Sequence, residues 1–97
     1  MTTLRLLGSE SGNKTCPCLY EADQDILVVQ GRGERGSDTV DVPHMLLDWA
    51  EPGMRIAVGA TEVPGRVLVK GTPASEEIMK QLFLDDDETA VEVPRCV

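Results

Sequence analysis

Apolar and polar positions repeat one pattern twice along the chain. An apolar run that ends in glycine, 26–31, is followed by a segment in which valines alternate with acidic residues, 38–43. The second copy consists of residues 67–71 and 88–94. A period of two is typical of strands, and the proline that ends each alternating segment lacks the amide donor a strand needs. The pattern predicts a small sheet built from two related halves.

Two short helices are expected between these strands. After Pro43 and His44, a helical stripe is formed by Leu46, Leu47, Trp49 and Ala50. Thr72 can cap a second helix with Pro73 at its first position. The apolar face of that helix would carry Ile78, Met79, Leu82 and Phe83. We expect both stripes to lie in the core, with Trp49 and Phe83 as its largest side chains.

The remaining apolar segments suggest a hairpin. Residues 54–59 and 66–71 read as strands joined through Val63-Pro64-Gly65, where proline followed by glycine favours a type II turn. The predicted fold class is α+β, with a mostly antiparallel sheet of four to five strands and two short helices.

The length of 97 residues fits one domain. Residues 9–15 are polar and rich in turn formers, so we expect 1–15 to be a flexible N-terminal segment and 16–97 to be a single domain. The apolar runs are too short for a secretory signal or a membrane span. A soluble, cytoplasmic protein without membrane contacts is expected.

Seventeen acidic residues against nine basic ones give a net charge of −8. This charge opposes direct binding of DNA or RNA. It fits a role in solubility alone, and the alternative is a protein partner with a basic face. The candidate partner-binding residues are the strand carboxylates, two loop arginines and the only tryptophan. They are Asp38, Asp41, Glu88, Glu92, Arg32, Arg35 and Trp49.

The glycine-rich segment 31–36 has the letters of a dinucleotide-binding G-x-G-x-x-G motif. That motif works only where a helix starts at the glycines and points its N-terminus at the pyrophosphate. Here a strand pattern ending at Pro43 follows instead. We therefore expect a loop between strands, and no nucleotide cofactor.

Cys16, Cys18, Cys96 and His44 have the number of ligands that a zinc site needs, without a recognisable spacing. Catalysis by a serine or cysteine nucleophile would require His44 as its base, because the chain has no other histidine. No nucleophile motif accompanies it. We expect a protein that is not an enzyme and that needs no cofactor.

A family resemblance rests on strand-like phrases covering about half of the chain: 18–21, 27–31, 39–49 and 88–94. In these the chain resembles small acidic actinobacterial proteins encoded beside helix-turn-helix regulators, a circle that includes the BldB-like developmental proteins. The resemblance implies a non-enzymatic accessory factor that acts through a DNA-binding regulator and is compatible with a homodimer.

The leading hypothesis is therefore a protein-interaction module that assists a helix-turn-helix transcriptional regulator. A small metal- or redox-responsive protein that uses its cysteines is one alternative. A self-assembling structural subunit is the other, because one apolar patch can serve a second copy as well as a partner.

Overall fold

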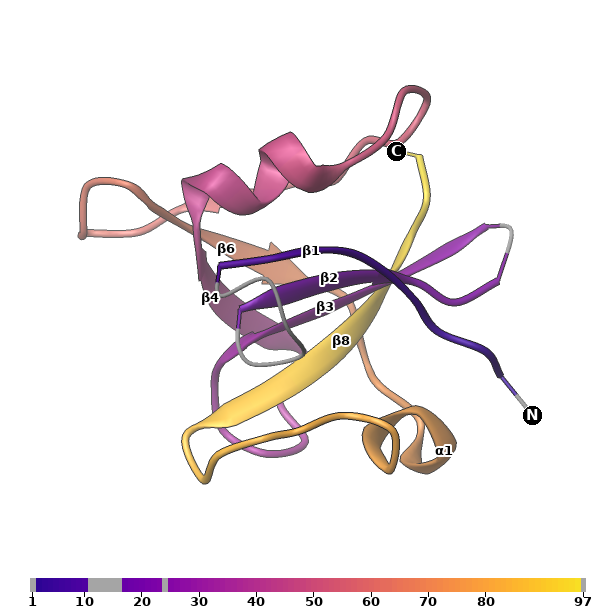
Figure 1. Cartoon of the computed structure of the whole chain (residues 1–97). Helices are drawn as coiled ribbons and strands as arrows, with labels where there is room; N and C mark the ends of the chain where they lie inside the picture. Colours follow the sequence, from indigo (N-terminus) through magenta and orange to yellow (C-terminus); the bar gives the residue numbers. More distant parts are fainter. Residues whose placement is uncertain (1, 11–16, 24, 97) are drawn as a thin grey trace.

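The computed structural model of this protein describes residues 2–10, 17–23 and 25–96. It contains eight strands in one antiparallel sheet and two short helical pieces (Figure 1). The strands are β1 (Arg5–Ser9), β2 (Cys18–Glu21), β3 (Ile26–Arg32), β4 (Thr39–Pro43), β5 (Gly59–Ala60), β6 (Arg66–Lys70), β7 (Thr72–Pro73) and β8 (Glu88–Pro94). The helical pieces are the 3₁₀ helix η1 (His44–Trp49) and the α-helix α1 (Glu76–Met79). The expected α+β fold with four to five strands is therefore wrong, because the molecule is mostly sheet.

The four strands of the repeated pattern are confirmed as β3, β4, β6 and β8. The turn before β6 also lies where the sequence placed it. The amide of Arg66 donates to the carbonyl oxygen of Val63 at 3.2 Å, and Gly65 has the positive φ of 83° that a type II turn requires.

Both helices are shorter than expected. Thr72 and Pro73 form β7 and pair with β8, so α1 begins only after Ser75, whose hydroxyl accepts a hydrogen bond from the amide of Ile78. Residues 44–49 form a 3₁₀ helix rather than an α-helix. At α1, the pairing of β7 with β8 takes up the residues that a longer helix would need.

Two further predictions, one for a strand and one for the N-terminal segment, differ from the structure. Residues 55–58 are irregular, and only β5 pairs with β6 in the segment predicted as a strand over 54–59. At the N-terminus, β1 is paired with β2 inside the sheet, although the sequence placed 1–15 in a flexible segment. Residues 11–15 of that segment lie outside the described part of the chain.

The two copies of the repeated pattern pair crosswise. The first strand of copy one, β3, pairs with the last strand of copy two, β8, and β4 pairs with β6. The registers of these ladders correspond position by position. The pair Leu27–Val93 in the first ladder corresponds to Val67–Val42 in the second. In the same way, Val28–Glu92 corresponds to Leu68–Asp41, and Val29–Val91 corresponds to Val69–Val40.

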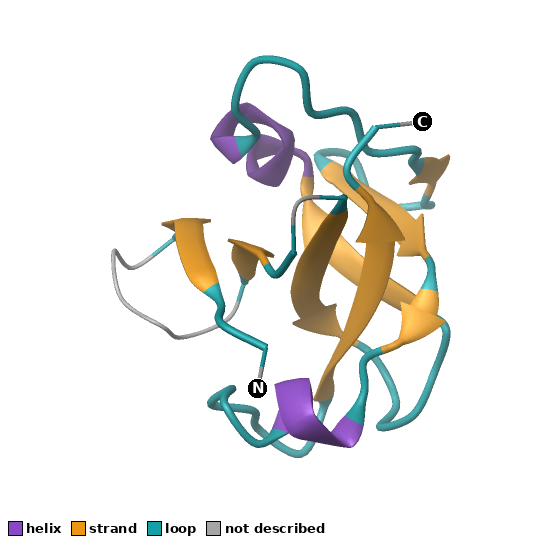
Figure 2. Ribbon diagram, turned by 90° about the vertical axis from the view of Figure 1, so that its right-hand side faces the viewer, coloured by secondary structure: helices purple, strands orange, loops and turns teal. Residues whose placement is uncertain are grey.

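This pairing closes the sheet on itself. Arg32 at the end of β3 pairs with Asp41 of β4, and Thr72 of β7, two residues beyond β6, pairs with Glu92 of β8. These contacts are again equivalent in the two copies. The circuit β3–β8–β7/β6–β4–β3 is a small closed barrel, and Figure 2 shows the strongly curled sheet with η1 and α1 at its two ends.

The interior of this barrel is built from corresponding side chains of the two copies. Eight buried residues on the four central strands form its core together with Leu19, Leu46 and Met54. The eight are Leu27, Val29, Val40, Val42, Val67, Val69, Val91 and Val93. A second cluster lies on the outer face of β2, β3 and β8, where Ile78 of α1 and Leu82 cover Tyr20 and Val28. No helix among the described residues is long and apolar enough to cross a lipid bilayer.

Candidate protein-interaction surface

The acidic residues expected to bind a partner make hydrogen bonds within the chain. Asp41 Oδ1 lies 2.5 Å from Arg66 Nε in an ion pair between β4 and β6. Glu92 Oε2 accepts a hydrogen bond at 2.9 Å from the amide of Ser75, which leads into α1. Glu88 Oε1 accepts one from the amide of Asp85. These carboxylates therefore stabilise turns and strand pairs.

The two predicted arginines have different surroundings. Arg32 was expected in a loop but is the last residue of β3, and Arg35 lies in the loop after it. Arg35 joins two loops, because its guanidinium donates to the carbonyl oxygens of Glu88 and Asp85 at 3.0 Å each. Arg32 is exposed and lines a cleft of about 160 Å³ together with Asp41, Arg66 and Glu88. Three of the seven predicted residues meet in this cleft, but its charges are mixed in sign, so it offers no single charge to a ligand.

Trp49 packs against the barrel core, as a partly buried residue of η1. Its ring lies against Gly8 of β1, so closely that a methyl group at that glycine would overlap the indole. Asp38 is exposed at the start of β4, where it accepts a hydrogen bond from the hydroxyl of Thr39. The structure thus distributes the predicted residues over several faces.

The proposed metal ligands lie apart where they are described. Cys18 is buried under α1, His44 and Cys96 are exposed, and Cys16 is outside the described residues. Burial raises the pKa of the Cys18 thiol, and a hydrogen bond with Tyr20 only partly offsets this. In the described ranges, the one group of three potential metal ligands is Asp85, Asp87 and Glu88, which lies in an exposed turn.

Phe83 was expected in the core and is instead 67 % exposed. The reason is a buried polar group beneath it. Gln30 is fully buried in β3, and its amide donates to the carbonyl oxygen of Phe83 at 2.7 Å. This bond satisfies the glutamine donor and fixes the backbone with the ring outside.

An exposed apolar hollow that sequence reasoning missed lies beside β5. It has a volume of about 320 Å³ and is lined by Thr39, Ala57, Val58, Gly59, Leu68 and Lys70. Val58 is 42 % exposed at its rim. Lys70 is its only charged lining residue. We call this surface the β5 hollow.

The repeat explains why the β5 hollow is open. Leu68 corresponds to Val28 and Thr39 to Ala90 in the pairing of the two copies. Val28 and Ala90 are fully buried beneath Ile78 and Leu82, whereas Leu68 and Thr39 are only partly buried. The same outer face is thus covered in one half of the barrel and uncovered in the other. The sequence signal for this hollow is Leu68, an apolar residue at a position of β6 that the alternating pattern assigns to the solvent-facing side.

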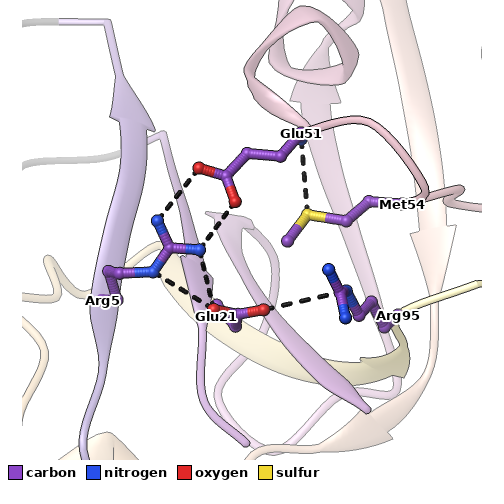
Figure 3. A network of polar contacts seen from close by, with 5 residues as sticks. All are labelled: Arg5, Glu21, Glu51, Met54 and Arg95. Atoms are coloured by element: carbon purple, nitrogen blue, oxygen red, sulfur yellow. Dashed lines mark hydrogen bonds and ion pairs between the residues drawn. The ribbon is translucent and has the colours of Figure 1, made fainter. Parts of the chain in front are cut away.

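The opposite edge of the sheet, β1, is held by a network of charged groups (Figure 3). Arg5 Nη2 lies 2.7 Å from Glu21 Oε1 on β2 and 2.7 Å from Glu51 Oε1 just after η1. Arg95 Nε approaches Glu21 Oε2 at 3.7 Å. These bonds raise the pKa of Arg5, with Glu51 as the larger cause, and lower the pKa of Glu51. No comparable ion pair is found along β5 in the part of the chain that the structure describes.

No protein-family model matches this sequence, and comparisons with curated proteins and with solved structures found no similar protein. The function must therefore be argued from the surfaces of the molecule.

Proposed function

We propose that this chain is a non-enzymatic protein-interaction module and that its partner is a helix-turn-helix transcriptional regulator in the cytoplasm. The β5 hollow is the observation that carries the first part of this proposal. It exposes Val58 and Leu68 on a face whose counterpart is sealed by α1. An exposed apolar patch in a small domain is typical of a binding surface.

The charge of the molecule supports the choice of partner. A net charge of −8 attracts proteins with a basic surface, and DNA-binding regulators carry such surfaces. The resemblance to small acidic proteins encoded beside helix-turn-helix regulators supports the same partner class. In this arrangement, the acidic surface accelerates association and the hollow supplies affinity.

The proposal is tested by capturing partners from a lysate of the native host with three tagged forms of the protein. These are the wild type, Val58→Asp and Val63→Asp. Both variants place the same charge at an exposed valine, but only Val58 lines the hollow. We expect a helix-turn-helix regulator with the wild type and with Val63→Asp, and at least about tenfold less of it with Val58→Asp.

Equal recovery of the regulator by all three forms would show that the hollow is not the binding surface. Recovery of partners without a DNA-binding domain would contradict the accessory role. If only the protein itself is recovered, sedimentation of the purified forms distinguishes a self-assembling subunit, because Val58→Asp would then dissociate the assembly.

A further inference from the structure

The two halves of the barrel correspond beyond their central strands. In one half, Tyr20 and Glu21 of β2 pair with Val28 and Leu27. In the other half, Gly59 and Ala60 of β5 pair with Leu68 and Val67, at the matching register. Strand β5 therefore occupies the position in its half that β2 occupies in the other.

One strand, β1, has no counterpart in the other half of the barrel among the described residues. The outer edge of β2 carries β1, in which Leu6 pairs with Tyr20. Strand β5 pairs only with β6 among the described residues, so the position equivalent to β1 is open. An open edge of this kind is a template for an additional strand.

We propose that the β5 edge binds an extended segment of the partner as an added antiparallel strand, with an apolar side chain inserted over Gly59. This inference rests on the proposed function and specifies its mode of recognition. The antiparallel direction follows from β1, which is antiparallel to β2.

The side chains explain why an apolar residue is required. Tyr20 is 1 % exposed and fills the outer cluster of its half. Gly59, at the equivalent position, has no side chain, and a Cβ atom built there would meet only Leu68 Cβ, at 4.0 Å. The space that Tyr20 fills in one half is therefore part of the β5 hollow in the other. A side chain of the incoming strand can fill it.

Charge narrows the sequence of the incoming segment further. Lys70 is the only charged residue that lines the hollow, so a carboxylate next to the inserted apolar residue would meet its ammonium group. The whole molecule carries a net charge of −8, which favours basic residues elsewhere in the segment. The expected ligand is an extended peptide with an apolar residue, one neighbouring carboxylate and flanking basic residues.

The test uses a displayed library of short random peptides, selected on the wild-type protein. Synthetic copies of the enriched peptides are then titrated against the wild type, Gly59→Val and Val63→Ser. Valine at position 59 fills the hollow with a residue that suits a strand, whereas Val63 lies on the exposed turn before β6. Denaturant unfolding of each variant confirms that it folds like the wild type.

We expect the enriched peptides to share an apolar residue beside a carboxylate. They should bind Gly59→Val at least about tenfold more weakly and Val63→Ser as well as the wild type. Amide hydrogen exchange over 57–60 should slow when such a peptide binds, because an added strand bonds to the edge. Lys70→Glu keeps the test decisive if Gly59→Val folds poorly, since it should remove the preference for the carboxylate.

The inference is overturned if the library yields no enriched peptide, or if the peptides bind Gly59→Val as tightly as the wild type. Neither result changes the outcome expected in the capture experiment with Val58→Asp. The loss of strand binding and the loss of the accessory function are therefore separately observable.

Discussion

At the scale of single residues, two glycines set how closely the strands of the barrel approach one another. A Cβ atom at Gly31 would overlap Val42 Cγ1 and lie 2.9 Å from the carbonyl oxygen of Asp41. At Gly71 it would overlap the carbonyl oxygen of Glu92 and lie 2.7 Å from Val93 Cγ1. The contacts correspond in the two copies, so the same steric requirement occurs twice.

We predict that Gly31→Ala and Gly71→Ala each lower the free energy of unfolding by about 1–3 kcal/mol, because backbone atoms must move to admit the methyl group. Gly59→Ala is the matched control, since a Cβ atom at that position meets only Leu68 Cβ, at an ordinary contact distance of 4.0 Å. Urea unfolding at neutral pH measures all three variants. Unchanged stability in Gly31→Ala and Gly71→Ala would show that the central strands can separate without cost.

The candidate site was only partly predictable at this scale. The sequence identifies Asp41 and Glu92 as charged strand residues, but their engagement with Arg66 and Ser75 depends on which strands become neighbours. Phe83 reads as core because its spacing fits an apolar stripe, yet the donor of buried Gln30 captures its backbone carbonyl. The β5 hollow depends on the register that places Gly59 opposite Leu68, which no local pattern encodes.

At the scale of elements, the pattern of apolar residues identified the long central strands of the barrel and failed for the two shortest strands. Strands β3, β4, β6 and β8 carry runs of apolar residues or alternating valines, which are sufficient local signals. Strands β5 and β7 have two residues each, too few for a periodic signal. Thr72 and Pro73 have the residue types of a helix start, but in the folded chain they pair with β8 as a strand.

Strand β1 is held at its edge by charge, and this makes its attachment dependent on pH. The Arg5 guanidinium lowers the pKa of Glu51 below its ordinary value of 4.5. A carboxylate with a lowered pKa in the folded state contributes its full stabilisation above that ordinary value. The contribution is lost as the pH falls through the lower folded value.

We therefore predict that Glu51→Gln is less stable than the wild type near neutral pH and that the two proteins converge in strong acid. Urea midpoints measured across the acid range test this. Glu62→Gln, a substitution on an exposed turn, should follow the wild type throughout. Since Arg5 and Glu51 are both exposed, added salt should reduce the difference. A gap between Glu51→Gln and the wild type that persists unchanged in strong acid would contradict the role of the ion pair.

At the scale of the whole molecule, crosswise pairing makes the two halves interdependent. The chain divides between η1 and β5 into a segment with β1–β4 and a segment with β5–β8. Both main ladders, β3–β8 and β4–β6, join one segment to the other. Each segment alone retains only its internal pairings, β1–β2–β3–β4 in the first and β5–β6 and β7–β8 in the second, and exposes the valines of the core.

We predict that peptides covering 1–51 and 52–97 are each unfolded in isolation and regain strand structure when mixed in equal amounts. Far-ultraviolet circular dichroism of the separate and mixed peptides provides the measurement. A peptide that folds by itself would show that its ladders do not need the other segment.

The closing of the barrel by β8 also has a consequence during synthesis on the ribosome. Strand β3 is made before its main partner, which comprises residues 88–94, and residues 33–87 are synthesised in between. One edge of β3 can pair with β2, but the edge that faces β8 stays unpaired while 33–87 are synthesised, a condition in which nascent chains aggregate. Acidic side chains interspersed along the sequence repel other nascent chains during this interval. The excess of acidic residues, already present in the first half of the chain, thus limits aggregation of the unfinished protein.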